Sequence, residues 1–204
     1  RVGEDGPTHQ PVEQEAQIRL MEHLKNHHGD NSMLVLRPAD APETNIAWKL
    51  ALENTSTPTA LILSRQNIKT LPSEGKPRIE AAAMAARGAY VVTDTGGSPD
   101  VILVASGSEV ATLVEAAALL AGDGIKARIV SAPSEGLFRK QDKEYRDSVM
   151  TPGTPVFCLT AGLPVTMLGF AGSEGKVFGL ESFGYSASYK TLDEKFGFTG
   201  ENVA

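Results

Sequence analysis

The chain has 204 residues, of which 41% are hydrophobic and 22% are charged, and its formal net charge is −6. These values are typical of a globular protein with room for one large domain or two small ones. The mild acidity and the lack of a basic stripe argue against a nucleic-acid surface. No apolar run reaches the roughly twenty residues that span a bilayer, and no signal-peptide pattern is present, so we expect neither nucleic acid nor a membrane as a partner.

The chain opens on a polar run, Gly3–Pro11. Its glycines and prolines restrict the backbone around two carboxylates, a hydroxyl, an imidazole and an amide, which belong to Glu4, Asp5, Thr8, His9 and Gln10. This pattern predicts a rigid, irregular loop ahead of a helix. Such a loop is a common place for ligand contacts, and a well-capped surface turn is the alternative. Because the chain begins inside this run and not at a methionine, we expect a fragment of a longer protein.

A strand–helix–strand unit is predicted next. After a helix from Pro11 to about His28, short apolar runs predict buried strands at 33–36 and 59–64, with a helix that begins at Pro42 between them. Short links of this kind force the two strands into parallel pairing.

A second α/β unit follows the breaker-rich stretch 70–77. Strands are predicted at 88–93, 100–105, 125–130, 156–160 and 177–180, with helices at 110–121 and around 189–196. Because Gly96 and Gly97 allow a tight turn, we expect 88–93 and 100–105 to form an antiparallel hairpin. The predicted fold class is therefore α/β, with an incomplete parallel-sheet domain over 1–75 and a smaller, complete domain with a mixed sheet over 76–204.

The polar run resembles a motif of the transketolases. The likeness extends through Val12-Glu13-Gln14 and continues in Leu61–Asn67, Gly107–Val110 and Lys195–Thr199. It covers the whole chain but only the C-terminal part of the family's usual length. It implies the end of a pyrimidine-binding domain followed by a transketolase C-terminal domain. It also implies an enzyme of the pentose phosphate pathway that uses thiamine diphosphate to move a two-carbon ketol unit between sugar phosphates, as a cytoplasmic homodimer with its active site between subunits.

The same resemblance assigns roles to three residues. Asp5 and His9 match positions that contact the hydroxyls next to the carbonyl of the ketose donor, and Arg65 matches the position that grips the terminal phosphate. Arg65 also follows a predicted parallel strand, where ligands bind in open α/β sheets, and a guanidinium suits phosphate oxygens. A surface ion pair is the alternative for Arg65. For Glu4 we prefer a capping or interface carboxylate.

The cofactor anchors that the family uses lie upstream of this stretch. They are the Gly-Asp-Gly metal motif and the glutamate that activates the cofactor, so thiamine diphosphate and Mg²⁺ would belong to the complete enzyme. We expect no cofactor or metal ligands in this chain, no ketol transfer by it alone, and the N-terminal part of the transketolase as its partner. A non-catalytic oligomerisation or regulatory module over 88–204 remains an alternative. A related deoxyxylulose-phosphate synthase is another alternative, although the residues of the polar run favour transketolase.

Other reactive residue types are interpreted as structural. Ser106-Gly107-Ser108 lacks the full glycine fingerprint of a phosphate loop, so we expect Ser108 to be a helix N-cap. Cys158 lies among apolar residues and is expected to be a buried thiol. The histidines of the insertion-like stretch 21–31 are expected to be solvated, and the mixed charges of 138–146 to form an exposed helix face.

Overall fold

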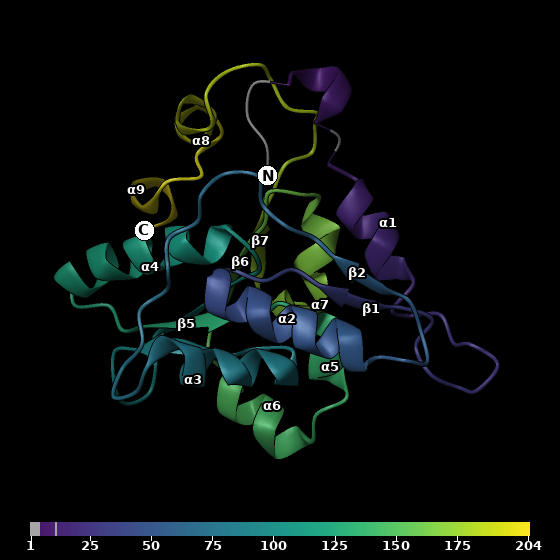
Figure 1. Cartoon of the computed structure of the whole chain (residues 1–204). Coiled ribbons are helices and arrows are strands. Elements are labelled where there is room, and N and C mark those ends of the chain that lie inside the picture. The colour runs from purple at the N-terminus through teal and green to yellow at the C-terminus, as the bar shows by residue number, and fades with distance from the viewer. Residues whose placement is uncertain (1–4, 11) are drawn as a thin grey trace.

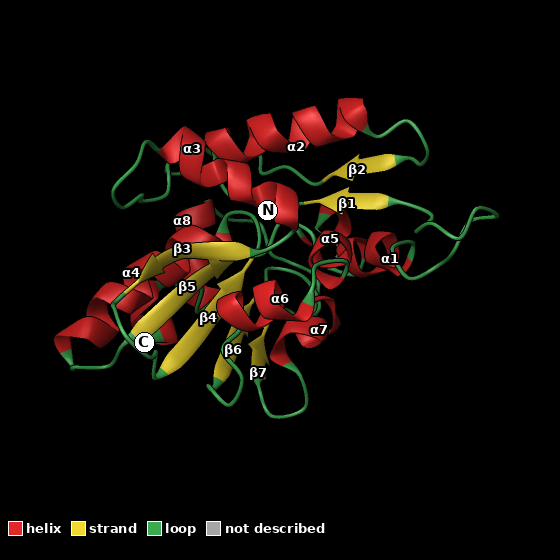
Figure 2. Cartoon of the chain, turned by 90° about the horizontal axis from the view of Figure 1, so that it is seen from below, coloured by secondary structure: helices red, strands yellow, loops and turns green. Residues whose placement is uncertain are grey.

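The computed structural model in Figure 1 describes residues 5–10 and 12–204. It contains a two-stranded sheet and a five-stranded sheet, which Figure 2 shows as separate layers with helices around them. The α/β fold class predicted from the sequence is confirmed, with a small parallel sheet and a larger mixed sheet.

The first sheet is the predicted strand–helix–strand unit. Strand β1 (Leu34–Leu36) pairs in parallel with β2 (Thr59–Leu61), and α2 (Ala41–Glu53) connects them. The side chain of Asp40 accepts a hydrogen bond from the amide of Glu43 at 2.9 Å and so caps the start of α2. Strand β2 ends three residues earlier than the predicted range 59–64.

The first helix is shorter than the sequence predicted. Helix α1 spans Gln14–Leu20 and follows the 3-10 turn η1 (Pro7–His9), and the predicted start at Pro11 lies outside the described residues. After α1 the amides of Met21, Glu22 and His23 donate to carbonyls only three residues back, and the chain continues in turns. Farther on, the side chain of Asn26 accepts hydrogen bonds from the amides of His28 and Asp30, which competes with a helix there. The predicted extension to His28 was therefore wrong.

The five-stranded sheet has the order β3-β5-β4-β6-β7. Its strands are β3 (Tyr90–Asp94), β4 (Val101–Ala105), β5 (Ala127–Ser131), β6 (Val156–Leu159) and β7 (Lys176–Phe178). Strands β4 to β7 are parallel, while β3 pairs antiparallel with β5.

The predicted hairpin between 88–93 and 100–105 was wrong, because β5 lies between β3 and β4. Gly96 and Gly97 do adopt positive φ angles of 86° and 74°, but they turn the chain toward a strand that is not adjacent. Burial explains the outcome. Strand β4 is almost fully buried and takes the centre of the sheet, whereas β3 is mostly half-buried and takes an edge.

Two apolar clusters cover the two faces of this sheet. Leu103 and Ala105 belong to the cluster with α4 (Glu109–Gly122) and Phe198, whereas Ile102 and Val104 belong to the cluster with Phe138. The alternation along β4 is that of a strand buried on both faces. The remaining helical segments are α3 (Arg78–Ala82), η2 (Ala83–Arg87), α5 (Glu135–Arg139), α6 (Lys143–Val149), η3 (Pro164–Met167), α7 (Leu168–Ala171), α8 (Tyr189–Phe196) and α9 (Gly200–Val203). In the part of the chain that the structure describes, no helix is long and apolar enough to cross a bilayer.

The first part of the chain sits on the carboxyl ends of the parallel strands of the larger sheet. The amide of Arg37 donates to the carbonyl of Pro133, which follows β5, at 2.9 Å, and the amide of Gly107, which follows β4, donates to the carbonyl of Arg37 at 3.1 Å. The amide of Leu163, which follows β6, donates to the carbonyl of Val12 at 3.2 Å. These bonds join loops of the second part to the first sheet and to the start of α1.

We predict that Gly107→Ala destabilises the protein more than Gly124→Ala does. Both glycines have positive φ angles, 63° and 80°, so both variants carry the left-handed strain of about 1 kcal/mol. A Cβ at Gly107 would lie 2.8 Å from Cζ of Arg37, whereas nothing lies within 4 Å of one at Gly124. Overpacking should therefore add about 1–3 kcal/mol to the loss in the Gly107 variant, measured by urea unfolding. Equal losses of stability in the two variants would contradict the close approach of Arg37 to Gly107.

Candidate functional site

The opening loop is ordered around Gly6. This residue has a φ of 77°, and its carbonyl accepts a hydrogen bond from the amide of His9 at 3.2 Å. The hydroxyl of Thr8 lies 2.8 Å from Nδ1 of His9. Glu4, the further carboxylate considered from the sequence, lies outside the described residues.

The structure brings Asp5 and Arg65 together. Nη1 of Arg65 lies 2.8 Å from Oδ2 of Asp5, although the two residues are 60 positions apart in the chain. Arg65 follows Leu61, the last residue of β2, and so lies beyond the carboxyl end of that strand. The two side chains are 56% and 38% exposed, and a pair that is so open to water contributes only about 0.2–1 kcal/mol to folding. The pair is therefore available for exchange with another anion or hydroxyl at little cost to stability.

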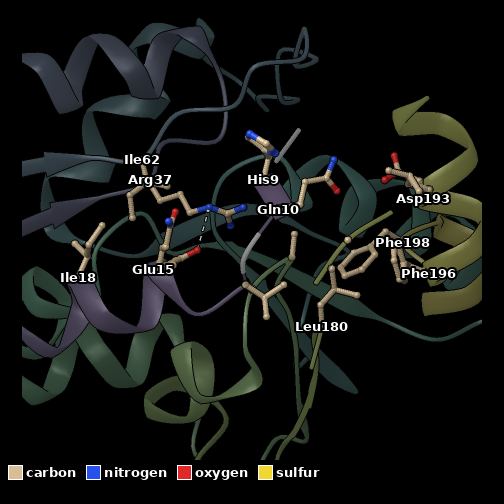
Figure 3. A pocket seen from close by; sticks show the side chains of 16 residues that line it. His9, Gln10, Glu15, Ile18, Arg37, Ile62, Leu180, Asp193, Phe196 and Phe198 are labelled. Atoms are coloured by element: carbon tan, nitrogen blue, oxygen red, sulfur yellow. Dashed lines mark ion pairs between the residues drawn. The ribbon is translucent and has the colours of Figure 1, made fainter. Parts of the chain in front are cut away.

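His9 lines a cavity of about 260 Å³ between the first part of the chain and α8. In Figure 3, His9 and Gln10 lie between a wall with Arg37 and Glu15 and a wall that contains Phe196. Asp5 and Arg65 are not among the residues that line it. The structure thus joins two of the three predicted site residues directly and places the third on an adjacent cavity.

Arg37 forms the charged inner wall of this cavity, and sequence reasoning missed its role. Its Nε lies 3.4 Å from Oε2 of Glu15, and its Nη2 lies 2.5 Å from Oε2 of Glu109. Its Nη1 donates to the carbonyl and the hydroxyl oxygen of Ser106, at 2.5 and 3.1 Å. The only signal in the sequence was a charge directly after a buried strand, which does not identify its partners.

The pKa values of Arg37 and Glu15 are shifted in the directions that favour their charged forms. Burial alone would lower the pKa of Arg37, but the carboxylates of Glu109 and Glu15 raise it above its usual value. Burial alone would raise the pKa of Glu15, but the charges of Arg37 and Arg19 hold it below its usual value. Each charge therefore keeps its ionised partner, as a buried ion pair must.

The guanidinium of Arg37 also packs against the Ser106-Gly107-Ser108 turn at the start of α4. Arg37 lies against Gly107 and donates to the carbonyl of Ser106, so a protein side chain occupies the place beside this turn. Ser108 occupies the N-cap position of α4 as expected, but its hydroxyl donates to Oε1 of Glu109 at 2.6 Å and makes no bond to the helix backbone.

Two amides near the site residues lack hydrogen-bond partners among the described residues. The side-chain oxygen and nitrogen of Gln66, next to Arg65, are buried without a partner, and so is Nε2 of Gln10, next to His9. A buried polar group left unpaired costs about 1–3 kcal/mol, so these amides are places where a ligand or another chain segment would gain hydrogen bonds.

The other reactive residue types have structural surroundings. Cys158 is a free, buried thiol, as predicted, and burial raises its pKa to about 12. His27 and His28 are exposed, and His23 is exposed beside Arg139. Over residues 5–10 and 12–204, no group of three or more His, Cys, Asp or Glu side chains could hold a metal ion. These residues do not fit the metal–diphosphate anchor of thiamine diphosphate, and the chemistry they offer is hydrogen bonding and charge.

Comparison with known proteins gives matches to both parts of the chain. Residues 1–70 match the family described as the transketolase pyrimidine binding domain, and residues 88–199 match the transketolase-like TK C-terminal domain. Transketolase 2 of Vibrio parahaemolyticus is 43% identical over 203 residues, which make up 99% of this chain and 29% of that protein. Both segments are therefore transketolase domains, joined in that family's order. The chain belongs to the transketolase family and spans 29% of the length of this relative.

Solved structures agree with this assignment. The transketolase from Leishmania mexicana superposes with a TM-score of 0.84 at 39% identity, over 98% of this chain and 27% of that one. A Pichia stipitis transketolase in complex with sedoheptulose-7-phosphate superposes with a TM-score of 0.82 at 40% identity, over 99% of this chain and 27% of that one.

We predict that Glu15→Gln lowers stability at pH 7 by about 1–3 kcal/mol, because Arg37 and Arg19 lose a buried anionic partner. Since the pKa of Glu15 in the folded protein is below its ordinary value of 4.5, the contribution of its charge to stability is fully present above about pH 4.5 and is lost as the pH falls through the lower, folded-state pKa. The stability of the variant should therefore change less steeply below pH 4.5, measured by urea unfolding across pH. Glu144→Gln, at an exposed position of α6, makes the same charge change and should leave the profile as it is.

Proposed function

We propose that the chain is the C-terminal portion of a transketolase and supplies the contacts to the donor sugar phosphate. In this proposal Asp5 and His9 contact hydroxyls next to the ketose carbonyl, and Arg65 grips the terminal phosphate. The observation that carries it is the contact of Arg65 with Asp5 beyond the carboxyl end of β2, on an open α/β unit. A sugar phosphate in a related Pichia stipitis enzyme supports the substrate class.

The exposed pair suits exchange with such a substrate. A terminal phosphate competes with the Asp5 carboxylate for the Arg65 guanidinium, and each charge-assisted hydrogen bond contributes roughly 1.5–3 kcal/mol. The carboxylate that is set free then accepts a hydrogen bond from a sugar hydroxyl. The imidazole of His9 donates to a second hydroxyl or exchanges a proton with it. A site with a partner for each hydroxyl discriminates strongly against analogues that lack one.

The complete enzyme is proposed to be a cytoplasmic homodimer of the pentose phosphate pathway, with thiamine diphosphate and Mg²⁺ held by its N-terminal part. Several features of the first part support a covering partner. Its described sheet has only two strands, which is marginal for independent stability. Trp48 and Leu52, four positions apart on α2, are 50% and 77% exposed, and the buried amide of Gln66 lacks a described hydrogen-bond partner.

In the complete enzyme, Arg65→Ala should raise KM for a phosphorylated donor by about 10- to 100-fold, since the lost bonds are worth roughly 1.5–3 kcal/mol. KM for a non-phosphorylated donor should change far less, because that substrate never makes the contact. Steady-state kinetics with both donors measures the two changes in KM.

The control is Lys143→Ala, which removes an exposed cation from α6 and should leave both KM values as they are. Equal losses on the two donors in the Arg65 variant would remove the phosphate role.

The chain alone should bind thiamine diphosphate with Mg²⁺ no tighter than millimolar and should transfer no ketol unit. Isothermal calorimetry measures the first and a coupled assay the second. Addition of the N-terminal part of the enzyme should restore both, and His9→Ala should abolish the restored transfer while leaving cofactor binding intact. Micromolar binding by the isolated chain would contradict the proposed division of labour. Restored transfer by a His9 variant would favour a purely structural module.

A further inference from the structure

We infer that the loops that follow β6 and β7 hold the opening loop in position, and that Gly184 is a positioning residue for the donor sugar. The two supporting loops are residues 160–163 and 181–186. This inference rests on the proposed function, because it concerns the loop that carries Asp5 and His9. In Figure 1 the segment between β7 and α8 runs beside the short purple turn η1, which belongs to the opening loop.

The closest contact is between Gly184 and Gln10, the residue after His9. The amide of Gly184 donates to the carbonyl of Gln10 at 3.2 Å. A Cβ at Gly184 would lie 2.0 Å from Oε1 of Gln10 and 3.0 Å from its Cβ and Cδ. The φ of Gly184 is outside the left-handed region, so the backbone conformation does not require glycine. The side chain of Gln10 is what occupies this space, so a methyl group at position 184 would have to displace it.

Further contacts hold the opening loop on both sides of Gln10. The amide of Leu163 donates to the carbonyl of Val12 at 3.2 Å, so the second supporting loop holds the chain just after the opening loop. At the other end, Gly6, next to Asp5, lies close to Ser186, since even a Cβ built on this glycine would be 3.7 Å from the Cβ of Ser186. The amide of Leu180, just before the loop 181–186, donates to the carbonyl of Gly162 at 2.9 Å and so ties the two supporting loops together.

Tyr185 anchors this support to the helix behind it. Its ring stacks on Phe196 of α8, with ring centroids 5.7 Å apart and an interplanar angle of 27°. The opening loop is thus held through Gly184 and Tyr185 by α8, which belongs to the C-terminal domain. The consequence is chemical as well as structural, because a displacement of about 1 Å in a group that contacts substrate can cost on the order of 100-fold in rate. We therefore assign the C-terminal domain a role in donor-sugar binding without direct contact to the sugar.

Kinetics of the complete enzyme test the inference. Gly184→Ala should raise KM for the ketose donor about 10-fold or more, because the added methyl group pushes Gln10 and the neighbouring His9 out of place. Gly122→Ala is the matched control, since a Cβ at Gly122 meets nothing within 4 Å, and it should leave KM unchanged. Tyr185→Ala should also raise KM, and Tyr185→Phe, which keeps the stacked ring, should restore the wild-type value. A merely structural role would lower the amount of active enzyme, and so the apparent kcat, without moving KM.

Amide hydrogen exchange of the chain itself gives the second readout. The peptide that contains residues 5–10 should exchange faster in Gly184→Ala than in the wild type or in Gly122→Ala. Unchanged exchange, or faster exchange with an unchanged KM, would overturn the inference. If the wild-type assembly transfers no ketol unit, the proposed function fails, and the exchange comparison alone then decides whether the supporting loops hold the opening loop.

Discussion

The buried guanidinium of Arg37 is the interaction on which the arrangement of the two parts depends. It joins Glu15 on α1 to Glu109 on α4 and to the neighbouring turn at Ser106, so it links two stretches that are far apart in the sequence. Its side chain is only 5% exposed, and removal of such a charge from water costs several kcal/mol unless every donor finds a partner. Because its partners come from both parts of the chain, the charges are satisfied only when the two parts dock in this one orientation. That orientation sets where α1, and therefore the opening loop, can lie.

A second buried polar cluster secures the docking on the side of α2. Arg78, just before the second sheet, lies 2.8 Å from Oδ2 of Asp40 through its Nε. The hydroxyl of Tyr90 on β3 donates to Oε1 of Glu43 at 2.5 Å. Burial and the nearby carboxylate of Glu43 raise the pKa of Tyr90, which favours the neutral phenol in this contact. Loss of any one of these side chains would leave a buried polar group without its partner. This explains why the junction is specific and not a loose apolar contact.

The docking held by the Arg37 and Arg78 clusters determines which edge of the C-terminal domain is open to a ligand. In an open α/β sheet the crevice at the carboxyl ends of the parallel strands usually takes a ligand. Here that edge is covered by the first part of the chain, through Pro133, Gly107 and Leu163. The domain acts on the proposed chemistry by holding the loop that bears Asp5 and His9, while the exposed pair of Asp5 and Arg65 stays open to a substrate. A rigid support beneath an exposed, weakly bound ion pair suits a site that must exchange partners.

The sequence by itself determined the local elements and the family. Apolar runs predicted the strands of both sheets, and the short crossover predicted the parallel pairing of β1 with β2. These features depend on residues close together in the chain, where burial and connection length leave few alternatives. The position of Arg65 after a strand followed from the same reasoning.

Only the tertiary structure decided which elements and charges meet. The place of β3 beside β5 depends on which strand is buried most, and the turns at 26–30 depend on side-chain hydrogen bonds of Asn26. The contacts of Asp5 with Arg65 and of Arg37 with Glu109 join residues that no sequence period links. A charged side chain carries no local signal of its partner, since any opposite charge satisfies it equally until packing brings one within reach and removes the water.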